Sequence, residues 1–211
     1  MNRIQGISLL VLSILIIDQL VKIYIKTHFY LGEEILVLGD WFRLYFIENN
    51  GMAFGLSFGG TTGKLFLSIF RIIAIGLIGF YLVHLHRKGA KTGLLVSIAL
   101  IFTGALGNVI DSAFYGLIFS DVYHYGQLAT LFPEEGGYAP FLQGKVVDMF
   151  YFPIIDFYFP DNFPFWPGKH FIFFRPVFNI ADASITIGVF SILLFYRSFL
   201  TGESKQHESE Q

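Results

Sequence analysis

The sequence predicts an α-helical membrane protein with four transmembrane helices and a small β-sheet on the outer membrane surface. Hydrophobic residues make up 54% of the 211-residue chain and charged residues only 14%. The mean hydropathy is +0.60, a balance that does not suit a soluble globular protein. Four apolar stretches are also long enough to cross a bilayer core, which takes about 20 helical residues. They cover residues 7–26, 64–86, 93–112 and 177–199.

The first stretch, 7–26, could be mistaken for a secretory signal peptide because Arg3 precedes it. It is long, has no small-x-small cleavage site and carries Asp18 and Lys22, so we expect a retained helix. Opposite charges four residues apart on a helix can pair. Two interpretations stay open: a neutralised pair in which Lys22 reaches toward water, or an Asp18 that supports other groups at a reaction site.

The connection between the second and third stretches sets the expected orientation. Residues 84–91 are strongly basic, which places this connection in the cytoplasm by the positive-inside rule. Both termini are then cytoplasmic, and the long connections 27–63 and 113–176 lie on the outer, periplasmic side. We expect residues 1–201 to form one membrane domain and the polar residues 202–211 to be a disordered cytoplasmic tail.

The first outer connection carries a hairpin signal. Two apolar runs, 35–38 and 41–46, flank Gly39-Asp40, which predicts a short β-hairpin. Because both runs are too apolar for water, we expect a sheet that lies on the membrane surface. The second connection is rich in Phe, Tyr, Pro and Gly and gives no clear strand pattern. Its aromatic content favours packing at the membrane interface over disorder.

Four carboxylates are expected near one level of the membrane. They are Asp18, Asp111, Asp148 and Asp182. Acidic groups at membrane depth are costly and usually functional. Asp148 and Asp182 could share one proton, as an aspartic peptidase requires. The ionised member would take a proton from water as the water attacks a peptide carbonyl, and the protonated member would polarise that carbonyl.

Amides and glycines accompany these acids. Asn49 and Gly51 occur in a loop that is either an ordinary turn or a backbone site for substrate. Asn108 and Asp111 are three residues apart and share a helix face. Asn179 could cap the fourth helix, which would put Asp182 in its first turn.

Other chemistries have weaker support. The net charge of −2 gives no argument for nucleic acid, and with no cysteine the chain has no disulfide, thiol nucleophile or thiolate metal site. No metal site has usable spacing, and no cofactor is expected. A Ser/His/Asp triad would need His28, His124 or His170, none of which sits in a recognisable motif.

The motifs taken together resemble one family. In order they are D-Q-x-x-K, N-x-G-x-A-F-G, G-A-L-G-N-x-x-D, V-V-D-x-F and F-N-x-A-D. This set, spread over residues 18–183, resembles the lipoprotein signal peptidases, or signal peptidase II. The resemblance implies a bacterial inner-membrane aspartic endopeptidase of four helices with a small periplasmic sheet that cradles the substrate.

The resemblance also implies partners and roles. Such enzymes cut prolipoproteins just before a diacylglyceryl-modified cysteine and bind cyclic peptide inhibitors such as globomycin. Besides its prolipoprotein substrates the chain would contact membrane lipid, bind no nucleic acid and act as a monomer. By motif, Asp148 and Asp182 are catalytic. The positions that line or support the site are Asp18, Lys22, Asn49, Gly51, Asn108, Asp111, Asn179 and Ala181.

Two departures from the family and two other functions complete the prediction. Ser112 follows Asp111 where the family has arginine, and residues 113–145 and 151–175 are long insertions. We expect these insertions to form an enlarged periplasmic flap or platform, so that deletion of about 120–140 impairs substrate handling and leaves the protein folded. The alternative functions are a proton-coupled transporter or channel and a non-catalytic assembly protein. A proton relay needs polar groups along the whole membrane depth, and the second stretch has no charged residue between Arg71 and His84.

Overall fold

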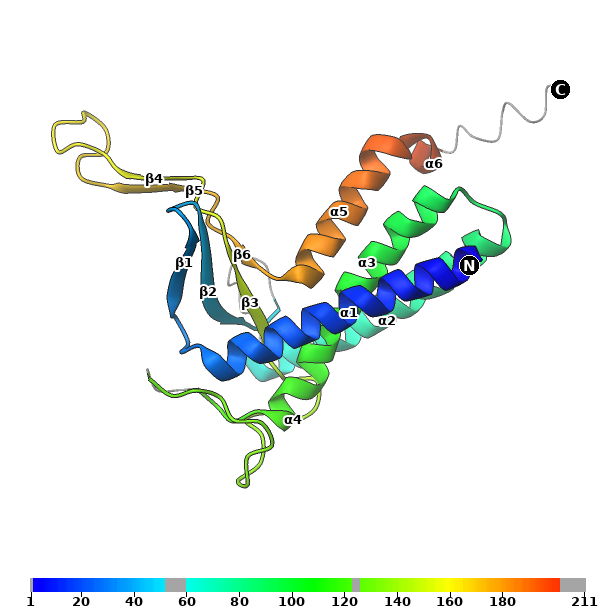
Figure 1. Ribbon diagram of the computed structural model, residues 1–211, viewed down its shortest axis with the longest axis horizontal. Coiled ribbons are helices and arrows are strands. Elements are labelled where there is room, and N and C mark those ends of the chain that lie inside the picture. The colour runs from blue at the N-terminus through cyan, green and yellow to red at the C-terminus, as the bar shows by residue number, and fades with distance from the viewer. Residues whose placement is uncertain (1, 52–59, 123–125, 202–211) are drawn as a thin grey trace. The chain divides into compact units, whose positions relative to one another are not determined.

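The computed structural model describes residues 2–51, 60–122 and 126–201. It divides into two compact units, which are described in turn (Figure 1). The helical unit comprises Met1–Gln19, Phe66–Ile110 and Ile180–Gln211, and the sheet unit comprises Leu20–Leu65 and Asp111–Asn179. The predicted tail at 202–211 lies outside the described residues.

Three helices in the described residues are long and apolar enough to cross a membrane. They are α1 (Arg3–His28), α2 (Gly60–Arg87) and the run Thr92–Ile118, which consists of α3 (Thr92–Ile110), a π-helix (Asp111–Tyr115) and α4 (Gly116–Ile118). Many of the exposed side chains of α1 and α2 are large and apolar, for example Leu12 and Phe80. Such faces suit contact with lipid. The first three predicted stretches are therefore confirmed as helices.

The fourth stretch differs from the prediction. Its helix α5 spans Ile180–Phe195, only 16 residues, and a short helix α6 (Arg197–Thr201) follows. The predicted start at 177 is wrong because β6 (Val177–Phe178) pairs with β3 (Val146–Tyr151) and is extended. The helix begins only after this pairing ends.

Within the helical unit, α3 and α5 pack closely because small residues face each other. A Cβ on Gly104 would lie 2.1 Å from the carbonyl oxygen of Ala181, and one on Gly188 would lie 2.5 Å from that of Ser97. Small residues let membrane helices approach at this distance. A hydrogen bond between the hydroxyls of Ser97 and Ser191, 2.8 Å long, joins the same two helices.

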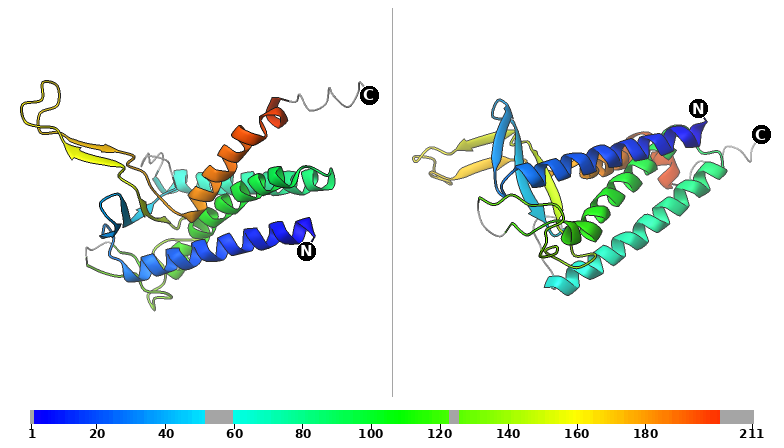
Figure 2. Two further views of the ribbon diagram at one scale, coloured as in Figure 1. Left: turned by 45° about the horizontal axis from the view of Figure 1, so that its top comes forward. Right: turned by 60° about the horizontal axis from the view of Figure 1, so that its bottom comes forward.

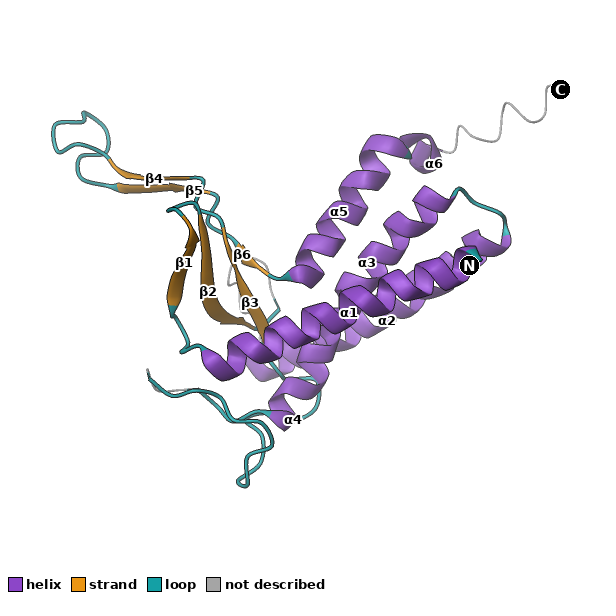
Figure 3. Ribbon diagram, viewed as in Figure 1, coloured by secondary structure: helices purple, strands orange, loops and turns teal. Residues whose placement is uncertain are grey.

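The sheet unit contains a four-stranded antiparallel sheet in the order β1-β2-β3-β6 (Figure 3). The hairpin of β1 (Glu34–Leu38) and β2 (Phe42–Asn49) confirms the predicted hairpin. The strand β3, which pairs with β2, was not predicted. Its sequence V-V-D-M-F-Y is buried at five of six positions, so it lacks the alternation that marks a half-exposed strand.

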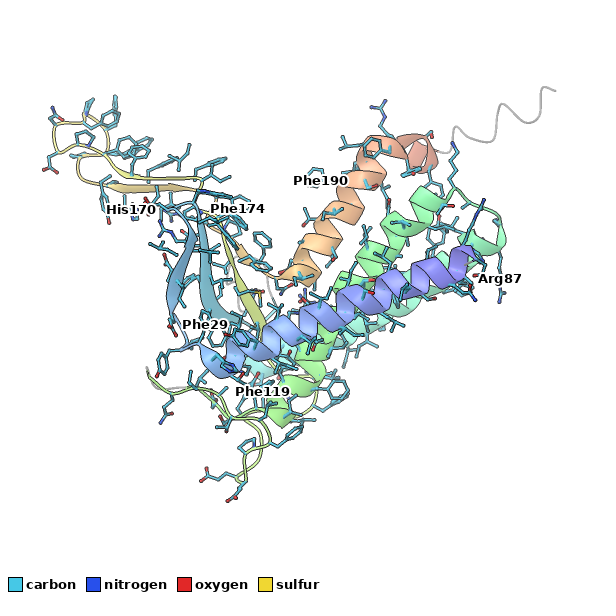
Figure 4. All side chains as sticks on the ribbon, in the orientation of Figure 1. Phe29, Arg87, Phe119, His170, Phe174 and Phe190 are labelled. Atoms are coloured by element: carbon cyan, nitrogen blue, oxygen red, sulfur yellow. The ribbon has the colours of Figure 1, made fainter. Side chains whose placement is uncertain are left out.

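The insertion at 151–175 forms a second sheet of two strands, β4 (Ile155–Tyr158) and β5 (His170–Phe173). This hairpin projects from the four-stranded sheet in each view (Figure 2). Its side chains include a series of exposed aromatic rings (Figure 4).

The insertion at 113–145 is packed into the core of the sheet unit. Phe119, Val122 and Ala129 are buried in one apolar cluster with Phe29 and Phe46. Phe29 and Phe119 are labelled in Figure 4. Deletion of 120–140 would remove buried side chains from this cluster, and cavities in a core cost stability. The structure therefore argues against the expectation that such a deletion leaves the fold intact.

Candidate active site

The predicted site residues gather in two polar clusters, one in each unit. In the helical unit, the cluster joins α1, α3 and α5 around the buried carboxylate of Asp18. The backbone N–H of Ala181 donates to Asp18 Oδ1 at 2.9 Å. Gln19 Nε2 donates to Asp18 Oδ2 at 3.1 Å and to the carbonyl of Gly107 at 3.4 Å.

The bond from Ala181 has a simple physical cause. Ala181 is the second residue of α5, and the first N–H groups of a helix have no partner within the helix. The positive end of the helix dipole also favours a carboxylate there. Asp18 thus caps α5 from a position 163 residues away in sequence.

Gly107 gives Asp18 the space that it needs. A Cβ at this position would lie 2.9 Å from Asp18 Oδ2 and 3.1 Å from the Cβ of Ala181. The close contact of α3 with α5 at this position therefore includes a carboxylate from α1.

Asp182 lies in the first turn of α5, as predicted, and is half-buried. Asn108 Nδ2 donates a hydrogen bond of 2.7 Å to Asp182 Oδ1. Asn108, near the end of α3, and Asp182, in the first turn of α5, are therefore in direct contact.

In the sheet unit, the cluster centres on Asp148, which is 2% exposed in the middle of β3. Asn179 Nδ2 donates to Asp148 Oδ1 at 2.7 Å and to the carbonyl of Val147 at 3.2 Å. Asn49 Nδ2 donates to Asp148 Oδ2 at 3.4 Å. Asn179 immediately precedes α5, where an N-cap was predicted, and its amide nitrogen is directed to this carboxylate.

Lys22 and Asp111 lie beside the same strand. Lys22 Nζ is 2.8 Å from Asp111 Oδ2, and neither side chain is exposed. Asp111 Oδ2 also accepts a hydrogen bond of 3.4 Å from the backbone N–H of Val147, the residue before Asp148. The interpretation in which Lys22 reaches toward water is wrong, because its side chain is fully buried.

Gly51 has a local role in the loop after β2. Its φ of 86° lies in the left-handed region that favours glycine. Its N–H donates to Asn49 Oδ1 at 2.8 Å, an Asx-turn that holds the Asn49 amide. The rest of the predicted loop, from residue 52, lies outside the described residues.

Ser112, which stands where the family resemblance predicts arginine, is buried at the start of the π-helix. Its carbonyl accepts a hydrogen bond of 2.8 Å from the N–H of Gly144. A Cβ on Gly144 would lie 2.3 Å from the carbonyl oxygen of Asp111. The chain leading into β3 therefore passes directly against this turn.

Sequence reasoning missed a buried ionic group next to Asn49. Lys26 Nζ donates to Glu48 Oε1, and Lys145 Nζ donates to Glu48 Oε2 at 3.0 Å. Burial alone would raise the pKa of Glu48, but the charges of Lys26 and Lys145 outweigh it and lower that pKa. Tyr138 lies under both ammonium groups, and burial raises the pKa of its hydroxyl. The partners are far apart in sequence, so spacing gave no signal.

Comparison with known proteins identifies the family. Residues 10–199 match the family described as signal peptidase (SPase) II. The chain belongs to the signal peptidase II family. A lipoprotein signal peptidase of Porphyromonas gingivalis is 48% identical over 90% of this chain and 82% of the relative. One from Amoebophilus asiaticus is 34% identical over 99% of this chain and 84% of the relative.

Solved structures agree with this assignment. One, described as a bacterial membrane enzyme, has a TM-score of 0.58 and 27% identity, covering 96% of this chain and 93% of the other. A second has a TM-score of 0.55 and 28% identity, covering 90% and 92%. As a signal peptidase II family member with long apolar helices, the chain is a membrane protein.

Proposed function

We propose that this protein is a prolipoprotein signal peptidase that uses Asp148 and Asp182 as an aspartic pair. Its substrates are prolipoproteins, and it cuts just before the diacylglyceryl-modified cysteine. Membership of the signal peptidase II family and relatives named lipoprotein signal peptidase support this activity.

The observation that carries the catalytic assignment is the contact between Asn179 and Asp148. Asp182 follows Asn179 by three residues, so the covalent chain keeps their Cα atoms within about 11 Å. Asn179, which binds the carboxylate of Asp148, is therefore held near Asp182 by the chain itself. Each acid also accepts from an asparagine on another element, Asp148 from Asn49 and Asp182 from Asn108.

Such a pair performs hydrolysis without a covalent intermediate. One carboxylate is ionised and removes a proton from water as the water oxygen bonds to the scissile carbonyl carbon. The other is protonated and donates to the carbonyl oxygen. Collapse of the tetrahedral intermediate breaks the C–N bond, and the departing nitrogen takes a proton from the pair. The asparagines hold the carboxyl groups in place through these steps.

The membrane arrangement is part of the proposal. The last turn of α2 carries His84, His86 and Arg87, which favours a cytoplasmic end by the positive-inside rule (Figure 4). The helix α5 is about 24 Å long at 1.5 Å per residue, and α6 continues toward the length of a fourth crossing. Both termini are then cytoplasmic, and the catalytic aspartates act toward the periplasm in the inner membrane.

A cleavage assay tests the proposal. The purified protein is incubated with a lipidated prolipoprotein, and release of the signal peptide is followed by mass. Asp148→Asn and Asp182→Asn should each abolish release, whereas Asp40→Asn, at an exposed turn, should retain it. Addition of globomycin should block the parent enzyme. Normal turnover by either of the first two variants would refute the aspartic mechanism, and equal cleavage of an unlipidated precursor would refute the substrate class.

A further inference from the structure

The hairpin β4–β5 has two chemically different faces. Direct partners in an antiparallel pair lie on the same face, and successive residues alternate between faces. The pairs Ile155 with Phe173 and Phe157 with Phe171 therefore form one wholly apolar face. These four side chains are 48%, 53%, 40% and 38% exposed, respectively.

The opposite face is largely polar: it carries Asp156, Tyr158 and His170, with Ile172 beside them. His170 Nε2 lies 2.5 Å from Asp156 Oδ1, and the His170 ring stacks on that of Tyr158. Arg43 of β2 bonds to Asp156 at 3.4 Å. Through Arg43 the polar face contacts the main sheet, so the apolar face is the one that the main sheet leaves uncovered.

The apolar face continues into the connecting loop as a preformed aromatic cluster. Phe159 is at the centre, with ring centroids 4.7 Å from Phe163, 5.5 Å from Trp166 and 4.9 Å from Phe157. Phe165 and Trp166 at the tip are 79% and 50% exposed. A surface this apolar, with rings already packed, marks a contact site.

Basic side chains border this aromatic face. Lys169 immediately precedes β5 and Arg175 follows it by two residues, and both are exposed. Rings with a polar edge, such as Trp166, suit the boundary between acyl chains and headgroups, and cations suit lipid phosphates. The hairpin belongs to a chain that is itself a membrane protein, so a bilayer is always within reach.

We propose that the β4–β5 hairpin is a membrane-binding arm. Its face of Ile155, Phe157, Phe171 and Phe173, together with the tip at Phe165 and Trp166, enters the headgroup and upper acyl region of the bilayer. Lys169 and Arg175 contact the phosphates. The polar face with Asp156 and His170 remains in water. This arm anchors the sheet unit to lipid independently of the proteolytic function.

The two tryptophans of the chain, Trp41 and Trp166, make a direct test possible. In a Trp41→Phe protein reconstituted into phospholipid vesicles, Trp166 is the single reporter. Lipids with a nitroxide on an upper acyl carbon should remove most of its emission, and aqueous iodide should remove little. Emission that iodide quenches as readily as it quenches a free tryptophan amide, with no effect of nitroxide lipid, would overturn the proposal.

Matched variants assign the contact to the proposed face. In the same background, Phe157→Ser with Phe173→Ser should lose the nitroxide quenching, while Tyr158→Ser on the opposite face should retain it. Phe165→Ser, in the loop and outside the strand pairing, should weaken it without altering the sheet. The same substitutions made in a Trp166→Phe protein, with Trp41 as the reporter, check that each leaves the main sheet intact. Quenching that persists in the double variant would refute the assignment.

Two further experiments distinguish lipid from other possible occupants of the apolar face. Lys169→Gln with Arg175→Gln should reduce the quenching, because these two cations contact the lipid phosphates. Shielding from iodide that rises with the ratio of protein to lipid would show that a second copy covers the face, and this result would overturn the membrane assignment.

Discussion

Lys22 and Asp111 form an ion pair of 2.8 Å from which water is excluded, because both side chains are fully buried. Removal of one partner deprives the other buried charge of this contact, and breaking a buried pair costs about 3–5 kcal/mol. Lys22→Met and Asp111→Asn should therefore each lower stability substantially. The double variant should lose less than the sum of the two, since either single change already removes the contact between them. Thermal unfolding in detergent measures all three stabilities. If the loss in the double variant equalled the sum of the two single losses, the pairing would be contradicted.

Gly107→Ala should disturb the cap that Asp18 places on α5. The added Cβ would lie 2.9 Å from Asp18 Oδ2, so the carboxylate or the helix must shift. Overpacking of this kind costs about 1–3 kcal/mol. Gly76→Ala is the matched control because a Cβ there meets nothing within 4 Å. It should be neutral or slightly stabilising. Unfolding midpoints and cleavage rates of the two variants should therefore diverge, and equal behaviour would count against the tight contact.

The two asparagines that bind Asp148 should differ in importance. Asn179 is fully buried and donates at 2.7 Å, whereas Asn49 is half-buried and donates at 3.4 Å. Asn179→Ala leaves the Asp148 carboxylate and the Val147 carbonyl without this donor, a loss of about 1–3 kcal/mol. We expect a larger decrease in kcat for Asn179→Ala than for Asn49→Ala. The reverse order would show that Asn49 is the principal support.

The ionic group around Glu48 should make stability depend on acid pH. Its pKa is lowered from the ordinary value of 4.5, so folding favours the charged form. This contribution is fully present above the unfolded-state pKa and is lost as pH falls through the lower folded-state pKa. Unfolding midpoints should therefore decline below about pH 4.5. Glu48→Gln should be less stable at neutral pH and show a smaller decline, and an unchanged pH profile would contradict this role.

The parts of the fold that could be predicted are those with a local signal. Three long apolar runs gave three helices, and Gly39-Asp40 between apolar runs gave the β1–β2 hairpin. The strand β3 could not be read because its residues are buried on both faces, so the pattern has no period of two. The start of α5 depends on pairing between Val177 and Tyr151, a long-range contact that no local pattern encodes.

In the site too, features with a local sequence signal could be predicted and those set by long-range contacts could not. Motif order identified the aspartates and their asparagines, and the structure places Asn108 at Asp182 and Asn179 at Asp148. Position along a helix suggested Lys22 as a neighbour of Asp18, whereas the contact of Lys22 with Asp111, 89 residues away, had no local signal. Lys26 and Glu48 carried no motif at all, since a buried ion pair is recognisable only once burial is known.

The π-helix at Asp111–Tyr115 changes how length differences can be accommodated in this family. An ordinary α-helix cannot lose one residue without rotating everything beyond the gap by about 100°. A π-turn already contains one residue more than an α-turn. A deletion within 112–115 would convert it to a regular turn while Asp111 and Gly116 keep their faces. Alignments of relatives should therefore tolerate a single-residue gap at this point, directly beside a buried aspartate, where length variation would otherwise be least expected.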